Sequence, residues 1–201
     1  VSARSVINVE NDLYFLSREG VRVLGNEPNF FSSIRTNILS KRIEPTTNTI
    51  NETSYTKSNG IYFNNQYMLS VPTSNSTIDT TLVYNKQFQA WSKWQGREAD
   101  GYTKYVNSNN EQILVFLSAD GTQANEFTPG VYTDDGVPIT SYLLSKVFDF
   151  KNPDITKYFV DLGLMFRTIS GQVELEVYTE GNVLFGGSAA IAGNPDRNSV
   201  V

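Results

Sequence analysis

Short runs of apolar residues separated by turn-forming residues open the chain. Three such runs occupy residues 6–9, 13–16 and 21–23, and turn signals lie between them at Asn11-Asp12 and Glu19-Gly20. Apolar runs of this length with tight turns between them are typical of neighbouring antiparallel strands. The first 25 residues therefore predict a three-stranded meander.

The same pattern returns twice. Residues 59–71 read as two strands around a turn at Asn64-Asn65, and residues 81–94 read as a hairpin. A third pass has turns at 107–110 and at Asp120-Gly121, with a strand between them. Asn, Asp and Gly are favoured at such positions because they tolerate the backbone of tight turns.

Three segments align loosely with one another. NDLYFLSREGVRVL begins at Asn11, NGIYFNNQYMLSVP at Asn59 and NEQILVFLSADGTQANEF at Asn110, so the pattern recurs about every 50 residues. A period of roughly 40 to 50 residues with four short strands per repeat is typical of β-propeller blades. We therefore expect an all-β fold that contains partial or split β-propeller blades.

Both tryptophans lie close together in the stretch YNKQFQAWSKW, which begins at Tyr84. In a propeller this stretch ends a blade. Because Trp91 and Trp94 are an odd number of residues apart, they lie on opposite faces of a strand. We expect one of them to pack between blades and the other to meet solvent or a neighbouring chain. A sugar-binding platform is the alternative.

One stretch has helical spacing. Phe31, Ile34 and Ile38 recur at intervals of three and four within residues 30–43, which allows either one short helix or a loop with a turn. The polar tract 44–58 that follows is predicted to be a long surface connection.

The pattern changes near residue 131. Residues 172–179 alternate strictly between apolar and polar, which predicts a strand with one wet face, and strand patterns also cover 142–150 and 157–167. We expect two regions, with propeller-like blades over 1–130 and an antiparallel β-sandwich segment with a C-terminal arm over 131–201. The Gly- and Ala-rich tail from Asn182 is either a loop or flexible arm, or an interface segment. The chain starts without Met and is expected to be a fragment of a longer one.

Composition limits the chemistry. The chain has no His and no Cys, which excludes His-based triads, thiolate catalysis, disulfides and Cys-ligated metals. Acid pairs occur at Asp134 and Asp135, Glu10 and Asp12, and Asp149 and Asp154. Two carboxylates are sufficient for some glycosidases, but Asp134-Asp135-Gly136 is first a turn signature. Loop oxygens leave calcium as an alternative. We expect no catalytic residue, cofactor or metal.

Charge and hydropathy restrict the partners. The net charge is −5 and the pI is about 4.8, with no basic run. Charge therefore gives no sign of nucleic-acid binding, although DNA contact through a local ring of Lys or Arg stays open. Basic residues cluster in the first third of the chain, at Arg18, Arg22, Arg35, Lys41 and Arg42. No apolar segment approaches the roughly 20 residues of a membrane span.

Together these motifs resemble a known family. SARSVINVENDLYFLSREGVRVL, NGIYFNNQYMLSVP, TLVYNKQFQAWSKW and SKVFDFKNPDITKYFVDLGL, all within residues 2–180, resemble the β-propeller virion proteins of tailed bacteriophages. These are the tail-hub, nozzle and DNA-stabilisation proteins beneath the portal.

The resemblance implies a structural, non-catalytic role in the phage tail. It implies a homo-oligomeric ring, hexameric in such proteins, that seals or channels packaged DNA and contacts the portal, an adaptor or a tail fibre. The residues that we expect at interface or packing positions are Trp91, Trp94, Tyr84, Arg18 and Arg22.

Two other functions fit the same pattern. A carbohydrate-binding or adhesin β-propeller would use Tyr and Trp rings as stacking platforms, and a two-carboxylate glycosidase would use Asp134 and Asp135. Glycan binding that depends on Trp91 or Trp94 would favour the first, and hydrolysis lost with the acid pair would favour the second.

Overall fold

The computed structural model describes the backbone of residues 2–26, 34–128, 133–134, 136–144, 164–166, 171–179, 182–191 and 198–200, and the side chains of residues 2–25, 36–128, 133 and 136–144. The chain divides into two compact units, Val1–Ile139 and Thr140–Val201, and each is described by itself. Strands dominate the described residues and every strand pair is antiparallel, so the prediction of an all-β chain is confirmed.

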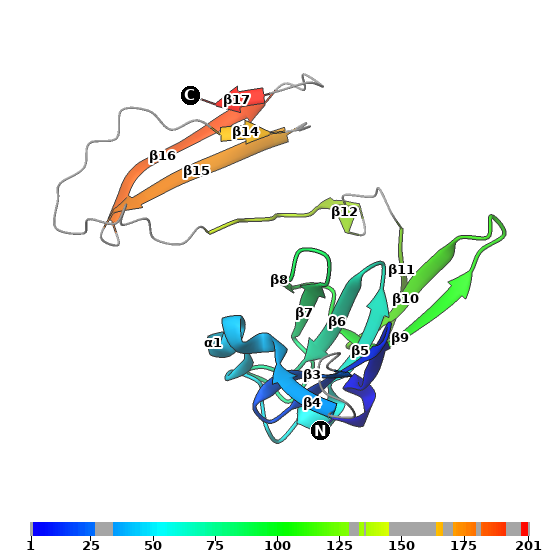
Figure 1. Cartoon of the computed structure of the whole chain (residues 1–201). Coiled ribbons are helices and arrows are strands. Elements are labelled where there is room, and N and C mark those ends of the chain that lie inside the picture. Colours follow the sequence, from blue (N-terminus) through cyan, green and yellow to red (C-terminus); the bar gives the residue numbers. More distant parts are fainter. Residues whose placement is uncertain are drawn as a thin grey trace. The chain divides into compact units, whose positions relative to one another are not determined.

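Three meanders follow one another in the first unit (Figure 1). The first sheet consists of β1 Ile7–Val9, β2 Asp12–Ser17, β3 Gly20–Asn26 and β4 Ile34–Ile38. The second sheet consists of β5 Asn59–Phe63, β6 Gln66–Val71, β7 Thr80–Asn85 and β8 Ala90–Trp94. The third sheet consists of β9 Ala99–Val106, β10 Gln112–Ser118 and β11 Ala124–Phe127. Within each sheet the strands pair in chain order, as the predicted turns require.

The tight turns carry the residues that their backbone demands. Asn64 and Asn65, between β5 and β6, both have positive φ, 48° and 60°, which matches the twist of a hairpin. Gly20 at the start of β3 has a φ of 105°, and a Cβ there would lie 2.4 Å from the Ser40 Oγ. That Oγ accepts the Val21 N–H at 3.0 Å. A side chain at position 20 would therefore be strained and would disturb this bond.

The helical interpretation of residues 30–43 is wrong for Ile34–Ile38 and holds only for the short turn Leu39–Ile43. Ile34–Ile38 is β4, paired with β3, and Leu39–Ile43 is the 3-10 helix η2, while residues 27–33 lie outside the described residues. Pairing with β3 gives Ile34–Ile38 a ladder of backbone hydrogen bonds, which outweighs the weak helical spacing of the apolar residues in this segment. The remaining helical turns are short, namely η1 Ala3–Ser5, α1 Glu44–Thr47 and η3 Tyr55–Lys57.

The repeat alignment is one strand out of phase at its second segment. Asn11 and Asn110 lie just before the second strands of their sheets, β2 and β10, whereas Asn59 begins β5, a first strand. The structural equivalents are therefore β2, β6 and β10. Their spacing is uneven because the connection 39–58 between the first two sheets contains helical turns, whereas only residues 95–98 separate the second and third sheets.

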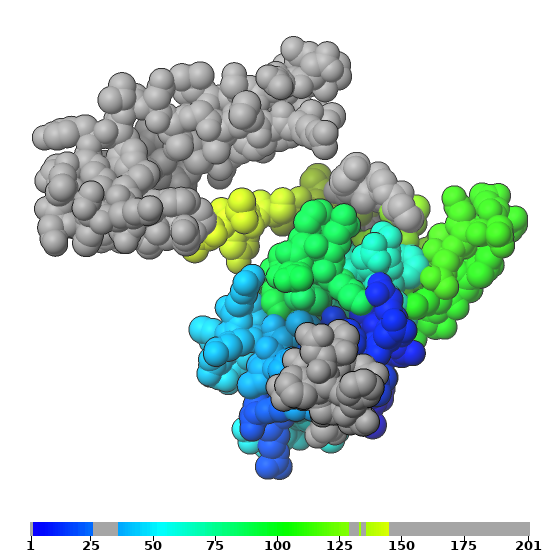
Figure 2. Space-filling model, in the orientation of Figure 1, coloured from blue at the N-terminus to red at the C-terminus, as the bar shows by residue number. Residues whose placement is uncertain are grey.

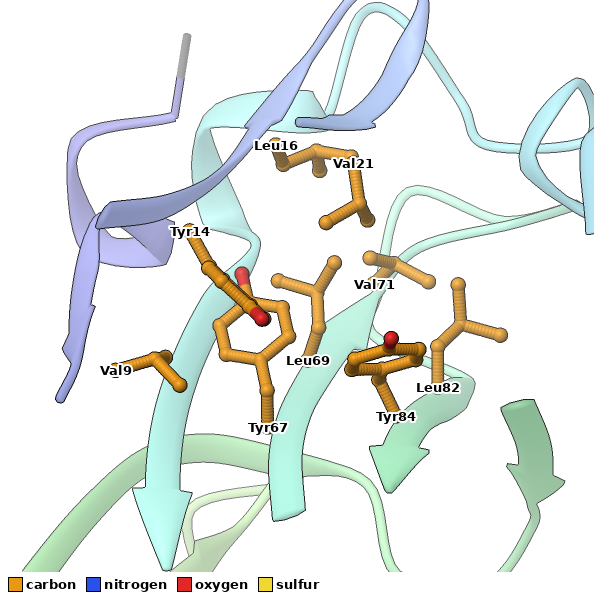
Figure 3. Close-up of a cluster of buried hydrophobic side chains, with 9 residues drawn as sticks. All are labelled: Val9, Tyr14, Leu16, Val21, Tyr67, Leu69, Val71, Leu82 and Tyr84. Carbon is orange, nitrogen blue, oxygen red and sulfur yellow. The ribbon is translucent and has the colours of Figure 1, made fainter. Parts of the chain in front are cut away.

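The second sheet lies between the first and the third. One core cluster joins the first and second sheets (Figure 3) and contains Val9, Tyr14, Leu16, Val21, Tyr67, Leu69, Val71, Leu82 and Tyr84. A smaller cluster joins the second and third sheets and contains Phe63, Met68, Val83 and Leu114. As a result β6 and β7 are buried on both faces. Among the described residues the sheets do not close into a propeller.

The β9–β10 hairpin extends beyond the rest of this stack. Figures 1 and 2 show it projecting in light green from the body that the three sheets form. Its outer part, residues 103–112, is exposed apart from the half-buried Asn107. The far end of the third sheet therefore has little packing from its own unit.

The first unit also includes the short pair β12 Thr133–Asp134 and β13 Val137–Pro138. In the second unit, β14 Leu164–Phe166 pairs with β17 Asn198–Val200, and β15 Gly171–Thr179 pairs with β16 Asn182–Ile191. The strand predicted over 172–179 is thus confirmed.

The interpretation of the tail as a loop is wrong where the structure describes it. Its first ten residues, Asn182–Ile191, form β16 along the whole length of β15. The ladder of hydrogen bonds to β15 outweighs the poor strand propensity of Gly and Ala. The strand patterns over 145–163 lie outside the described residues.

Candidate functional site

The two tryptophans pack on opposite faces of β8. Trp91 packs against the core between the first and second sheets, and its Nε1–H donates to the Leu39 carbonyl at 3.3 Å. Trp94 packs against the core between the second and third sheets and stacks parallel to Phe127, with ring centroids 6.0 Å apart. Both therefore lie between sheets, whereas the sequence interpretation left one of them for solvent or a neighbouring chain.

An aromatic row crosses the face of the second sheet that meets the first sheet. Strand pairing aligns Tyr62, Tyr67, Tyr84 and Trp91 across β5 to β8. Tyr14 of the first sheet packs on this row, with its ring centroid 5.5 Å from that of Tyr67 (Figure 3). Aromatic pairs at such distances contribute beyond their buried area. The row fixes how the first sheet sits on the second.

A hydrogen bond locks the centre of this row. Tyr67 is fully buried, and its hydroxyl donates to the Ser5 carbonyl at 3.0 Å. Burial strongly raises the pKa of Tyr67, so its phenol stays neutral. Ser5 in turn holds β2, because its Oγ accepts the Leu16 N–H at 2.9 Å. The segment before β1 is thus tied to both sheets.

Buried hydroxyls join the second sheet to the third. Ser70 is fully buried, and its Oγ lies 2.9 Å from the Thr81 Oγ1 and 2.6 Å from the Tyr102 hydroxyl. The same Oγ accepts the Ala99 N–H at 3.2 Å. Asn59 adds a bond from its Nδ2 to the Ala99 carbonyl at 2.7 Å. Sequence reasoning missed this group, because isolated Ser and Thr in a strand give no signal of their partners.

An ion pair connects the rims of the first two sheets. The Lys86 Nζ donates to the Glu10 carboxylate at 2.6 Å, and the Tyr62 hydroxyl donates to the other oxygen at 3.0 Å. The bond from Lys86 is the main cause that lowers the pKa of Glu10. Glu10 is therefore a structural carboxylate and not a proton donor at neutral pH. The sequence singled out Glu10 and Asp12 as an acid pair. Both oxygens of the Glu10 carboxylate are engaged by Lys86 and Tyr62, and these contacts do not support a catalytic role for that pair.

The other acid pairs are not placed. The side chains of Asp134 and Asp135, and Asp149 and Asp154, lie outside the described residues. In the part of the chain with described side chains, no group of three acidic, His or Cys residues lies close enough to hold a metal ion. No helix among the described residues is long and apolar enough to span a membrane.

The two basic candidates lie on one hairpin but have different surroundings. Arg18 is exposed in the turn between β2 and β3 and lines a polar pocket of about 490 Å³ with Thr47 and Tyr55. Burial raises the pKa of Tyr55 to about 12, so that hydroxyl is not an anionic ligand at neutral pH. Arg22 lies in β3, where it pairs with Glu19 and donates to the Thr36 Oγ1 at 3.1 Å.

Two apolar sheet faces remain outside the stack. On the first sheet, the face turned away from the core presents Leu13, Phe15, Leu24 and Ile38 around Arg22. On the third sheet, the corresponding face presents Tyr105, Val115 and Leu117, together with Glu126. We call these the first outer face and the third outer face. The sequence contains a signal for these two faces. In each strand every second residue lies in the core, and the apolar residues at the alternate positions indicate a second apolar face.

No protein-family model matches the chain, and no curated protein matches it significantly. The arrangement of the sheets and their faces is therefore the basis for a proposal of function.

Proposed function

We propose that this chain is a structural virion protein of a tailed bacteriophage. It forms part of the tail hub or nozzle below the portal, where a homo-oligomeric ring seals or channels packaged DNA. Its three meanders serve as propeller blades, and its second unit serves as a sandwich segment. Its partners are copies of itself and the portal, adaptor or fibre proteins of the same particle. It binds no cofactor and carries no catalytic group.

One observation carries the proposal, namely the way in which the three meanders pack. Each sheet turns a side-chain face to the next one, and each junction has both an apolar cluster and buried hydrogen bonds. Such junctions resist shear because buried polar groups must keep their partners. A stack of this kind suits a part that bears load in an assembly. The resemblance of the sequence motifs to tail proteins supplies the biological setting.

The carbohydrate-binding alternative has less support from the tryptophans. A sugar platform needs an open ring face, but Trp94 stacks on Phe127 and Trp91 packs on Tyr84, with ring centroids 5.0 Å apart. Both rings are instead used in junctions between sheets. Glycan binding would therefore have to use other aromatic residues.

Two measurements test the proposed function. Mass spectrometry of purified virions should detect this chain at a copy number that fits a ring, and cryo-electron microscopy of the particle should place it on the tail axis. Absence of the chain from virions whose genome encodes it would refute the virion role. A glycan array with the purified protein tests the alternative, and a positive result that persists in Trp91→Phe and Trp94→Phe variants would favour an adhesin.

A further inference from the structure

We propose that copies of this chain associate head to tail, so that the first outer face of one copy packs on the third outer face of the next. The inference deepens the ring of the proposed function and rests on it, because it names the two surfaces that meet. The occupant of each face is a second copy of this chain.

The first outer face is apolar and incompletely covered. Leu13 pairs with Leu24 across β2 and β3, and Phe15 and Ile38 flank Arg22 from the neighbouring strands. Leu13 is 40% exposed and Ile38 is 42% exposed. The opposite face of the same strands, in contrast, contributes Tyr14 and Leu16 to the core, where they are almost fully buried. A face with so much apolar surface is typical of an interface.

The third outer face has the same character. Val115 and Leu117 alternate along β10, and Tyr105 follows on β9. Leu117 is 40% exposed and Tyr105 is 43% exposed. Part of this face lies on the hairpin that projects beyond the stack (Figure 1). Ile113, which pairs with Tyr105 on this face, is buried, whereas Tyr105 and Leu117 leave apolar surface exposed among the described residues.

The charges favour contact between the first outer face of one copy and the third outer face of another over contact between two copies of the same face. Residues 1–43, which hold the first sheet, carry six Lys and Arg side chains against four Asp and Glu, whereas residues 99–127, which hold the third sheet, carry one against four. On the faces themselves, Arg22, which also pairs with Glu19 at the rim of its face, is the basic residue of one and Glu126 is the acidic residue of the other. Contact between unlike faces joins opposite charges, and contact between two copies of one face opposes like charges.

Hydrogen bonds and an ion pair within the chain already fix the charged side chains of the two faces. The Tyr105 hydroxyl donates to the Glu126 Oε2 at 3.0 Å, which keeps that carboxylate on the outer face. Arg22 is held by Thr36 and Glu19, and its side chain is only 23% exposed. Side chains that are already ordered lose less conformational entropy when a partner binds.

Head-to-tail contact between two different surfaces has a geometric consequence. A heterologous interface leaves one of each face free at the ends, so copies add until the rotation between them closes a ring. If the rotation does not close, the same contact makes a filament. The proposed ring thus needs no further interface.

Charge reversal tests the pairing. In sedimentation velocity and light scattering, the wild-type chain should form oligomers, and Arg22→Glu or Glu126→Arg alone should raise the dissociation constant about tenfold or more, because each sets like charges against one another. The double variant Arg22→Glu/Glu126→Arg should recover association. Lys93→Glu, an equal change of charge on an exposed residue of β8, should leave association unchanged. Tryptophan fluorescence confirms that each variant is folded.

Mixing the two single variants gives the sharpest result. Contacts between two copies of the same variant set like charges against one another, whereas both contacts between unlike variants join opposite charges, one as the wild-type pair of Arg22 and Glu126 and one as the reversed pair. The mixture should therefore associate although each variant alone does not.

Other results would overturn the inference. A wild-type chain that stays monomeric at its highest soluble concentration, association insensitive to Glu126→Arg, or association that the double variant fails to recover would each do so. The virion experiment is independent: an oligomer absent from virions refutes the proposed function and leaves the interface, whereas a monomer present in virions refutes the interface alone.

Discussion

Removal of the Tyr67 hydroxyl should weaken the junction between the first and second sheets. Tyr67→Phe keeps the ring, so the buried apolar area and the contact with Tyr14 remain. The change removes the 3.0 Å bond to Ser5 and leaves that carbonyl without this donor in a buried site. A typical net hydrogen bond contributes about 1 kcal/mol, and an unsatisfied buried acceptor adds to the loss. We expect a loss of about 1 to 2 kcal/mol in the free energy of unfolding.

Tyr62→Phe is the matched control. It makes the same change in the same aromatic row, but the Tyr62 hydroxyl bonds to Glu10 at an exposed site. Water can replace that bond, so the variant should lie within about 0.5 kcal/mol of wild type.

Urea denaturation followed by tryptophan fluorescence measures both variants. The two tryptophans of the chain lie in β8, so the signal reports the stack and not the second unit. If Tyr67→Phe unfolds at the wild-type midpoint, or Tyr62→Phe loses as much as Tyr67→Phe, then the buried hydroxyl does not lock the junction and the reasoning is wrong.

Three further predictions concern other parts of the stack. Burial raises the pKa of Tyr14 from 10.0 to about 12, so the stability from its neutral phenol is present below pH 10 and is lost as the pH rises toward 12; Tyr14→Phe should flatten that loss in unfolding free energy. Gly20→Ala should destabilise the unit by about 2 kcal/mol or more, and Gly121→Ala by about 1 kcal/mol, because both have positive φ but only a Cβ at Gly20 meets another side chain. A double-mutant cycle of Trp94→Leu and Phe127→Leu should give a coupling of about 1 kcal/mol.

Each of these has a contrary outcome. Equal loss of stability above pH 10 in wild type and Tyr14→Phe would mean that this phenol ionises as freely in the folded chain as in the unfolded one. Equal unfolding midpoints for the two glycine variants would remove the steric argument for Gly20. Additive losses for Trp94 and Phe127 would show that the stacked rings do not interact beyond their separate burial.

The local elements followed from sequence with few errors, and the errors have one cause. Strands β2, β5, β6 and β10 begin and end close to the predicted positions, because short-range turn chemistry sets those limits. β4 and β16 were predicted otherwise. In both cases a partner strand supplies hydrogen bonds that local propensity cannot reveal, since strand pairing depends on the neighbour as much as on the strand.

For the candidate residues, too, the sequence predicted the local geometry but not the tertiary contacts. Odd spacing correctly gives the opposite faces of Trp91 and Trp94, because the period of a strand is two. What each ring meets could not be read from that spacing. The structure supplies Phe127 for one ring and the Leu39 carbonyl for the other, and both partners lie more than 30 residues away.

The sequence by itself determined that this chain is all-β, that it turns where Asn, Asp and Gly allow, and that it lacks His and Cys chemistry. These properties depend on residue type and on neighbours along the chain. Only the tertiary structure decided which strand faces are shared between sheets and which remain open. That choice depends on contacts between residues far apart in sequence. Apolar residues on both faces of a strand do not reveal whether the second face meets another sheet, as in β6, or stays partly exposed, as in β2 and β10.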